Sequence, residues 1–170
     1  CGSSSDAGSS SGAGSSSEAG GTTDLSKVEL TVGTSGTYAP FSYFKEDGKT
    51  LQGFDVELLK ALQDKLGFKI KNDTIQDMDY GPLTTSLTQG QIDLGAAALC
   101  ATDERKEVMN FSDIYYDAGI IVAVGKDNND IKSVDDLTDG KYKVAVQTGT
   151  IAYEYATSKL LEKCLQSFDS

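Results

Sequence analysis

Arg105 is the residue of this sequence with the clearest chemical potential. It is the one arginine among 15 basic residues, the others being lysines. A guanidinium is a planar fork that pairs with both oxygens of a carboxylate, whereas a lysine ammonium is a point charge. Thr102 is placed to cap a short helix over 103–109, which would hold Arg105 in its first turn. Composition leaves two interpretations open, a clamp for a ligand carboxylate or a surface charge that pairs with Glu104 or Glu107.

The segment Gln147-Thr148-Gly149-Thr150 is a second candidate, because it lies between a predicted strand and the last predicted helix. Backbone N–H groups at the start of a helix, with a glycine that permits close approach, form a site for an anion such as a carboxylate. An ordinary strand-to-helix turn with a threonine cap fits the same residues and is the commoner case. No Gly-Lys-Ser/Thr follows and no GxGxxG occurs, so neither a P-loop nor a dinucleotide site is predicted.

Small residues and aromatic side chains are predicted near one edge of a sheet. Ala96 to Ala98 let a backbone approach a ligand closely, and Cys100 follows them. Tyr38 lies in a loop after a strand that ends at Gly33, and ligands of open α/β sheets bind beyond the carboxyl ends of strands. Tyr38 and Tyr80 could cover the aliphatic stem of a ligand with their rings. Each aromatic also fits a position in the core or at its rim.

The composition argues against several classes of function. Histidine is absent, which excludes Ser-His-Asp and Cys-His mechanisms and removes the commonest zinc ligand. The formal net charge of -11 argues against nucleic acid, whose phosphates require clustered Lys and Arg. Cysteines at 1, 100 and 164 form neither a disulfide framework nor a CxxC metal pattern. We expect no catalytic residue, no metal, no cofactor and no nucleic-acid partner.

Alternating strands and helices are predicted to position these residues. Hydrophobic spacing predicts strands over 28–33, 68–70, 92–98, 115–124, 144–146 and 165–168. Helices are predicted over 53–66, 83–90, 103–109, 133–137 and 152–163. Asp55 is the expected N-cap of the first helix, and Gly67 is expected just beyond its end. Strands that helices separate pair in parallel, so the predicted fold class is α/β.

Residues 1–24 are a segment of a different kind. The hexads SSSDAG, SSSGAG and SSSEAG contain no hydrophobic side chain larger than Ala, so nothing offsets the entropy of ordering the backbone. A flexible Ser/Gly tether is predicted. Cys1 before such a tether resembles the mature end of a bacterial lipoprotein, which implies a lipid on Cys1, a cleaved signal peptide and anchoring to the outer face of the cell membrane. An expression remnant or a chance cysteine is the alternative.

Six segments occur in a recognisable order between about Val28 and Thr157: VGTSGTYAPFSYF, GFDVELLKAL, LGFKI, QGQIDLGAAA, TDERKEVMNFSDIYY and VAVQTGT. Together they resemble the family 3 extracellular solute-binding proteins of polar amino-acid ABC transporters. The resemblance implies an α/β, periplasmic-binding-protein-like type II fold, whose two lobes close on a ligand as a Venus flytrap. It also implies extracytoplasmic binding of a free polar amino acid and delivery to the permease subunits of an ABC transporter.

The resemblance assigns a role to individual positions. Tyr80 matches the aromatic that stacks on the ligand, and Arg105 matches the arginine that binds the α-carboxylate. Ala98 and Cys100 lie where backbone and hydroxyl groups meet the amino and carboxyl ends of the ligand. A loop of the second lobe adds amides to the carboxylate. The complete set of expected ligand-binding residues is Ser35, Tyr38, Tyr80, Ala98, Cys100, Arg105, Gly149, Thr150 and Ile151.

Three positions depart from the family pattern. Ala98 and Cys100 replace the Ser or Thr that relatives often carry, so recognition of the amine would depend on backbone carbonyls. Ser35 stands where binders of basic amino acids often have Asp, which disfavours Lys, Arg or His as the ligand.

The resemblance also predicts how the chain is divided. Lobe 1 is expected over 25–118 and nearly complete, the first hinge strand over 119–124, and a partial lobe 2 over 125–170. A truncated product is expected, because the second hinge strand and the acidic residue that binds the ligand ammonium are missing from the sequence up to Ser170.

Two other functions share this fold. Some relatives are dehydratases of cyclic carboxylates; without histidine, Asp103 or Glu104 would be the acid-base candidates, and neither has an obvious carboxylate partner across the cleft. A ligand-sensing domain of a receptor would need a transmembrane helix and a signalling domain. A binding protein is therefore expected, not an enzyme.

Overall fold

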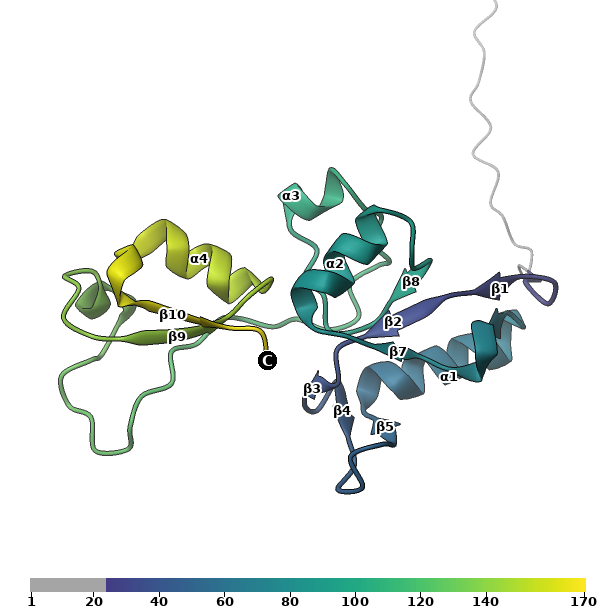
Figure 1. Ribbon diagram of the computed structural model, residues 1–170, viewed down its shortest axis with the longest axis horizontal. Helices are drawn as coiled ribbons and strands as arrows, with labels where there is room; N and C mark the ends of the chain where they lie inside the picture. The colour runs from purple at the N-terminus through teal and green to yellow at the C-terminus, as the bar shows by residue number, and fades with distance from the viewer. Residues whose placement is uncertain (1–23) are drawn as a thin grey trace, which may run out of the picture.

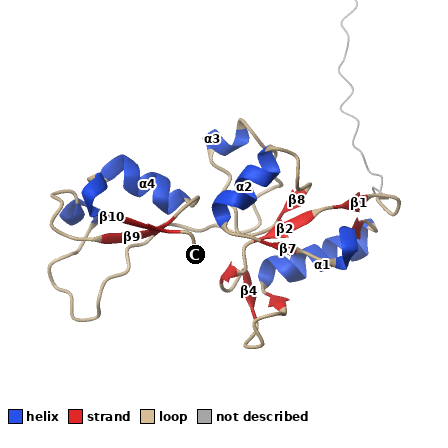
Figure 2. Cartoon of the chain, in the orientation of Figure 1, coloured by secondary structure: helices blue, strands red, loops and turns tan. Residues whose placement is uncertain are grey.

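The structure is a computed structural model that describes residues 24–170. It has a larger body, which holds β1 to β8 and α1 to α3, and a smaller body, which holds β9, β10 and α4 (Figure 1). Both bodies mix helices and strands, and loop joins them (Figure 2). The predicted tether, apart from Asp24, and the predicted lipid site Cys1 lie outside the described residues.

The larger body is built on a parallel three-stranded sheet. β2 (Val32–Thr34) lies between β7 (Gln76–Asp77) and β8 (Leu94–Gly95), and β1 (Glu29–Leu30) pairs in parallel with β6 (Lys69–Ile70). An antiparallel sheet contains β3 (Thr37–Tyr38), β4 (Ser42–Phe44) and β5 (Leu51–Gln52). The helices are α1 (Phe54–Leu66), α2 (Tyr80–Thr88) and α3 (Asp103–Lys106), with a 3₁₀ turn at Lys71–Asp73.

Helices α1 and α2 cover opposite faces of the β2 sheet (Figure 1). Val32 packs with Leu59 of α1 in one buried cluster. Gly33, the next residue of the strand, lies against Leu83 of α2 and Ile92, which belong to a second cluster. Successive residues of a strand face opposite sides of a sheet. The three residues of β2 therefore contact both buried clusters, one on each face.

The smaller body is a βαβ unit. β9 (Val144–Gln147) pairs in parallel with β10 (Leu165–Phe168), and α4 (Ile151–Lys159) packs on them. Two 3₁₀ turns, Val134–Leu137 and Glu162–Cys164, complete it. The strands predicted at 144–146 and 165–168 are confirmed, and so is their parallel pairing across a helix.

Several predicted elements are shorter than expected or absent. The strand predicted over 92–98 is reduced to β8, the helix over 103–109 ends at Lys106, and the last helix ends at Lys159. Residues 110–125 carry no strand, so the long strand over 115–124 and the hinge strand over 119–124 are wrong as secondary structure. A strand requires a neighbour to satisfy its N–H and C=O groups, and none of the described residues pairs with this segment.

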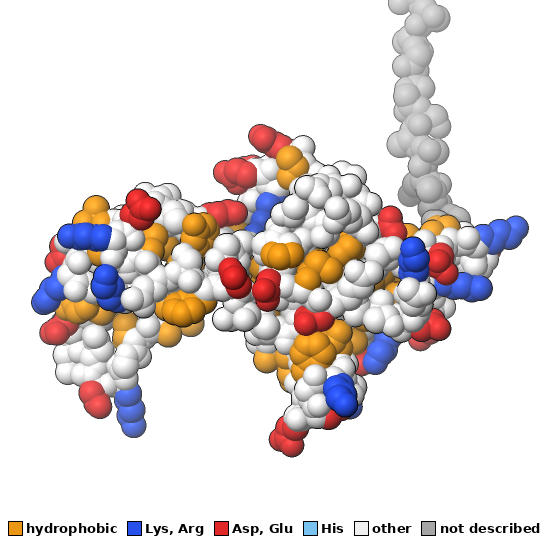
Figure 3. All heavy atoms as spheres, in the orientation of Figure 1, with side chains coloured by type: hydrophobic (Ala, Val, Ile, Leu, Met, Phe, Trp, Pro, Cys, Tyr) orange, Lys and Arg blue, Asp and Glu red, His pale blue; other side chains and the backbone are white. Residues whose placement is uncertain are grey.

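The unpaired segment leaves several apolar side chains in contact with solvent. Ile114 is 74% exposed and Ile121 is 87% exposed. Charged side chains of both signs are scattered over the visible face, and hydrophobic patches lie between them on both bodies (Figure 3). Within residues 24–170, no helix combines the length and apolar character that crossing a membrane requires.

Candidate functional site

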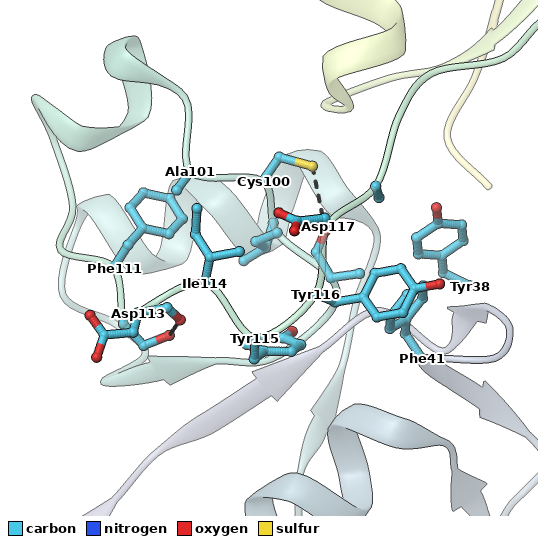
Figure 4. A pocket seen from close by; sticks show the side chains of 14 residues that line it. Tyr38, Phe41, Cys100, Ala101, Phe111, Asp113, Ile114, Tyr115, Tyr116 and Asp117 are labelled. Carbon is cyan, nitrogen blue, oxygen red and sulfur yellow. Dashed lines mark hydrogen bonds between the residues drawn. The ribbon is translucent and has the colours of Figure 1, made fainter.

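A cavity of about 220 Å³ lies between the 98–101 loop and the 111–118 segment (Figure 4). Three of the predicted ligand-binding residues, Tyr38, Ala98 and Cys100, line it. The ring of Phe41, another lining residue, lies 5.4 Å from Tyr38 and 5.1 Å from Tyr116 between centroids. These aromatic rings form one wall of the cavity, as Figure 4 shows.

Side chains from other elements hold the loop that borders the cavity. Thr34 Oγ1 donates to the Ala96 carbonyl at 2.6 Å, and the Tyr80 hydroxyl donates to the Ala97 carbonyl. Tyr80 is only 5% exposed, and burial raises the pKa of its phenol, so the hydroxyl remains a donor. The loop is therefore anchored by side chains of β2 and α2.

Arg105 is buried at the contact between the two bodies. Its Nη1 donates to the Cys100 carbonyl at 3.1 Å and its Nη2 donates to the Gly149 carbonyl at 2.9 Å. Thr102 Oγ1 accepts from the Arg105 backbone N–H at 3.3 Å, which confirms the predicted cap. Within residues 24–170, the two ion pairs, Lys60–Glu57 and Lys106–Asp103, do not involve Arg105, so its pairing with Glu104 or Glu107 is wrong.

The guanidinium is therefore held by neutral carbonyls. It offers five N–H donors, and the two bonds to carbonyls leave others for a ligand. A carboxylate would form stronger, charge-assisted bonds than these carbonyls do. The position of Arg105, beside the Cys100 carbonyl and the Gly149 loop, is suited to an anion that both bodies contact.

The other six predicted site residues do not line the cavity: Ser35, Tyr80, Arg105, Gly149, Thr150 and Ile151. The ring of Tyr80 lies edge-on to Tyr38, with 6.4 Å between centroids. The Ser35 Oγ lies 3.3 Å from Thr37 Oγ1. Ser35 has no exposed surface in this structure, so it does not contact the cavity.

The Gly149 loop begins α4. Thr150 is the N-cap of α4, with its Oγ1 accepting from the Tyr153 N–H at 3.2 Å, and Ile151 is the first residue of the helix. Gly149 has a φ of 80°, which favours glycine. The helix start thus presents backbone N–H groups near the carbonyl that Arg105 contacts. The cap and the turn predicted from Thr-Gly-Thr are both present.

Asp55 is a site residue whose role the sequence did not indicate. The predicted N-cap of α1 is wrong, because Gly53 occupies that position. The Asp55 carboxylate is 0% exposed, and it accepts from the Ala98 N–H at 2.6 Å and from the Tyr115 hydroxyl at 2.9 Å. Its sequence neighbours resemble any helix start, so only the tertiary structure places it beneath the cavity loop.

Metal chemistry has no obvious ligand set in the described part of the chain. Residues 24–170 contain no group of three or more His, Cys, Asp or Glu side chains arranged to hold a metal ion. Cys100, at the cavity, and Cys164, in the core of the smaller body, are free thiols.

Comparison with known proteins identifies the family. Residues 30–168 match the bacterial extracellular solute-binding proteins, family 3. The chain belongs to this family. Its α/β fold is that of the type II periplasmic amino-acid-binding proteins, as the sequence predicted.

Individual family members are similar over most of this chain. The arginine-binding extracellular protein ArtP of Bacillus subtilis is 42% identical over 132 residues, which are 78% of this chain and 49% of ArtP. The solved structure of AbpA from Streptococcus pneumoniae, an amino-acid ABC transporter substrate-binding protein bound to L-arginine, has a TM-score of 0.75 and 34% identity. That match covers 85% of this chain and 60% of AbpA.

A third similar structure bears on the enzyme alternative. An ancestral amino-acid-binding protein, a precursor of cyclohexadienyl dehydratase, has a TM-score of 0.74 and 35% identity, covering 85% of this chain and 66% of that one. It is itself named as a binding protein, as ArtP is. The present chain spans about half the length of ArtP.

Gly149→Ala is expected to separate the two bodies. A Cβ at Gly149 would lie 2.6 Å from the Gly81 backbone nitrogen, and the left-handed φ would cost about 1–2 kcal/mol. We expect a larger radius of gyration in small-angle X-ray scattering. Gly81→Ala is the matched control, because a Cβ there meets nothing within 4 Å. Identical scattering curves for the two variants would contradict the contact.

Proposed function

We propose that this family 3 chain binds a free amino acid outside the cytoplasm and delivers it to the permease subunits of an ABC transporter. The observation that carries the proposal is Arg105, a buried guanidinium between the cavity loop and the start of α4, whose partners among residues 24–170 are all carbonyls. A buried cation without a counter-ion favours an anionic ligand. The names of ArtP and AbpA, which bind arginine, support an amino acid as that ligand.

Each end of the amino acid has a proposed partner. The α-carboxylate bonds to Arg105 and to backbone N–H groups of the loop at Gly149, Thr150 and Ile151. The α-ammonium bonds to the Ala98 carbonyl, whose present partner is the Cys100 Sγ at 3.9 Å. A thiol is a weak donor, so an ammonium can replace it. Contacts from both bodies to one ligand would favour the closed arrangement.

The side chain of the amino acid is proposed to be cationic. Asp113 and Asp117 line the cavity, and no Lys or Arg is among the described residues that line it. Tyr38 and Tyr116 add aromatic faces, which attract cations. Ser35, which would disfavour a basic ligand by comparison with relatives, is buried away from the cavity.

A lipid on Cys1 and the Ser/Gly tether are proposed to hold the protein at the outer face of the membrane. A soluble ligand captured there would stay close to the permease, since a tether raises the local concentration of what it carries. The support for this anchor is the sequence of residues 1–24.

Calorimetric titration with the twenty common L-amino acids and with citrulline tests the function. We expect arginine or lysine to bind with micromolar affinity or tighter. Citrulline, a neutral analogue of the same shape as arginine, is expected to bind about 10-fold or more weakly, because the carboxylates lose their cationic partner. Absence of binding by every amino acid would contradict the proposal, and turnover of a cyclic carboxylate to an aromatic product would favour the dehydratase alternative.

A further inference from the structure

Asp55 joins three separate segments of the larger body. It lies in the first turn of α1, and its carboxylate has no exposed surface. Oδ2 accepts from the Ala98 N–H at 2.6 Å, and Oδ1 accepts from the Tyr115 hydroxyl at 2.9 Å. Ala98 belongs to the cavity loop, and Tyr115 lies in the segment that forms the facing side of the cavity.

Ala98 has a backbone conformation that requires such support. Its φ is 49°, in the left-handed region that residues with a Cβ seldom adopt. The Ala97 carbonyl, on the preceding peptide, accepts from the Tyr80 hydroxyl. The N–H on the same peptide donates to Asp55. Both polar groups of the 97–98 peptide are therefore fixed by buried side chains, and the turn at Ala98 then determines where its own carbonyl points.

The second partner of Asp55 keeps the carboxylate in place. Burial and the hydrogen bond to Asp55 both raise the pKa of Tyr115, so its hydroxyl remains a donor at neutral pH. A buried carboxylate with a charge-assisted bond at each oxygen cannot rotate without losing one of them. Asp55 therefore fixes the Ala98 N–H from an immobile position.

We propose that Asp55 is a positioning residue, which orients the Ala98 carbonyl toward the α-ammonium of the bound amino acid. This role rests on the proposed function, in which that carbonyl receives the ammonium. Asp55 does not touch the ligand, because its carboxylate has no exposed surface and both of its oxygens are already bonded within the protein. Its loss would affect recognition of the amine and leave recognition of the carboxylate by Arg105 intact.

The test compares two probes that differ only in the amine, L-arginine and 5-guanidinopentanoate. Calorimetry gives the affinity ratio of the two probes for the wild-type protein and for Asp55→Ala. The wild-type ratio is expected to be about 10 to 100, the value of one hydrogen-bonded ammonium, and to fall to about 3 or less in Asp55→Ala. Affinity for 5-guanidinopentanoate is expected to change by less than about threefold.

Two variants separate positioning from general stability. Asp55→Asn is expected to restore most of the ratio, because its carbonyl oxygen can accept from Ala98 while its amide donates to the Tyr115 oxygen. Asp64→Ala, which removes an exposed aspartate of the same helix, is expected to keep the wild-type ratio. If Asp55→Ala does not fold, Tyr115→Phe removes the second bond of Asp55, and the ratio is expected to fall about threefold.

Three results would overturn the inference. Unchanged affinities for both probes in Asp55→Ala, or in Tyr115→Phe where that variant replaces it, would show that the amine binds elsewhere. Equal weakening of both probes, which also leaves the ratio unchanged, would show a purely structural role. Failure of the wild-type protein to bind any common L-amino acid would overturn the proposed function itself. The titration of the wild-type protein alone distinguishes this result from the first two.

Discussion

Arg105→Ala is expected to weaken amino-acid binding by about 100-fold or more. The reason is that a ligand carboxylate would lose its only buried cationic partner in the described part of the chain, and a charge-assisted, two-point contact is worth about 3 kcal/mol. Arg105→Lys is expected to recover only part of the affinity, because an ammonium cannot form the planar fork. Calorimetric titration with L-arginine measures both changes.

Lys106→Ala provides the matched control for Arg105. Lys106 is the next residue of α3, and its Nζ lies 3.9 Å from Asp103 Oδ1 in an exposed ion pair. Such pairs contribute little, so its affinity should remain within about twofold of the wild type. Retained micromolar binding by Arg105→Ala would contradict the assigned role of the guanidinium.

Gly53→Ala is expected to destabilise the larger body by about 3 kcal/mol or more. Gly53 is the N-cap of α1 with a φ of 128°, and a Cβ there would lie 2.3 Å from the Phe41 carbonyl oxygen. That oxygen accepts from the Asp55 N–H at 2.9 Å, so the loop supplies the cap that no side chain provides. A Cβ at Gly53 would therefore displace the Phe41 carbonyl that caps α1, and it would also strain the backbone at Gly53.

Urea denaturation followed by circular dichroism measures this loss of stability. Gly48→Ala is the control, because Gly48 also has a positive φ, of 63°, but a Cβ there meets nothing within 4 Å. Its expected cost is only the left-handed conformation, about 1–2 kcal/mol. Equal urea midpoints for Gly53→Ala and Gly48→Ala would contradict the close approach of the Phe41 carbonyl to Gly53.

The parts of the fold that local sequence determines were predictable. Gly67 ends α1 in a left-handed conformation, and Thr150 caps α4, as glycine and threonine at these positions indicate. The strands of the smaller body were predictable from their apolar runs, because a βαβ unit pairs segments that are near in sequence. The Thr102 cap of α3, which accepts from the Arg105 N–H, was predictable for the same reason, since the two residues are three positions apart.

The parts that long-range contacts determine were not predictable. Residues 115–124 have the composition of a strand, but composition does not specify a pairing partner, and none of the described residues supplies one. Asp55 resembles a helix cap locally, and its bonds to Ala98 and Tyr115 join residues 43 and 60 positions away. Ser35 is buried for the same reason, since its environment is made by the fold rather than by its neighbours.

The most direct test of the account compares L-arginine with L-argininamide in calorimetric titrations of the wild-type protein. The two differ at the α-carboxylate, which the amide replaces with a neutral group. If Arg105 and the Gly149 loop bind that carboxylate, L-arginine should bind about 100-fold or more tightly than the amide. Equal affinities for the acid and the amide would contradict the central claim that this site recognises a free amino acid by its carboxylate.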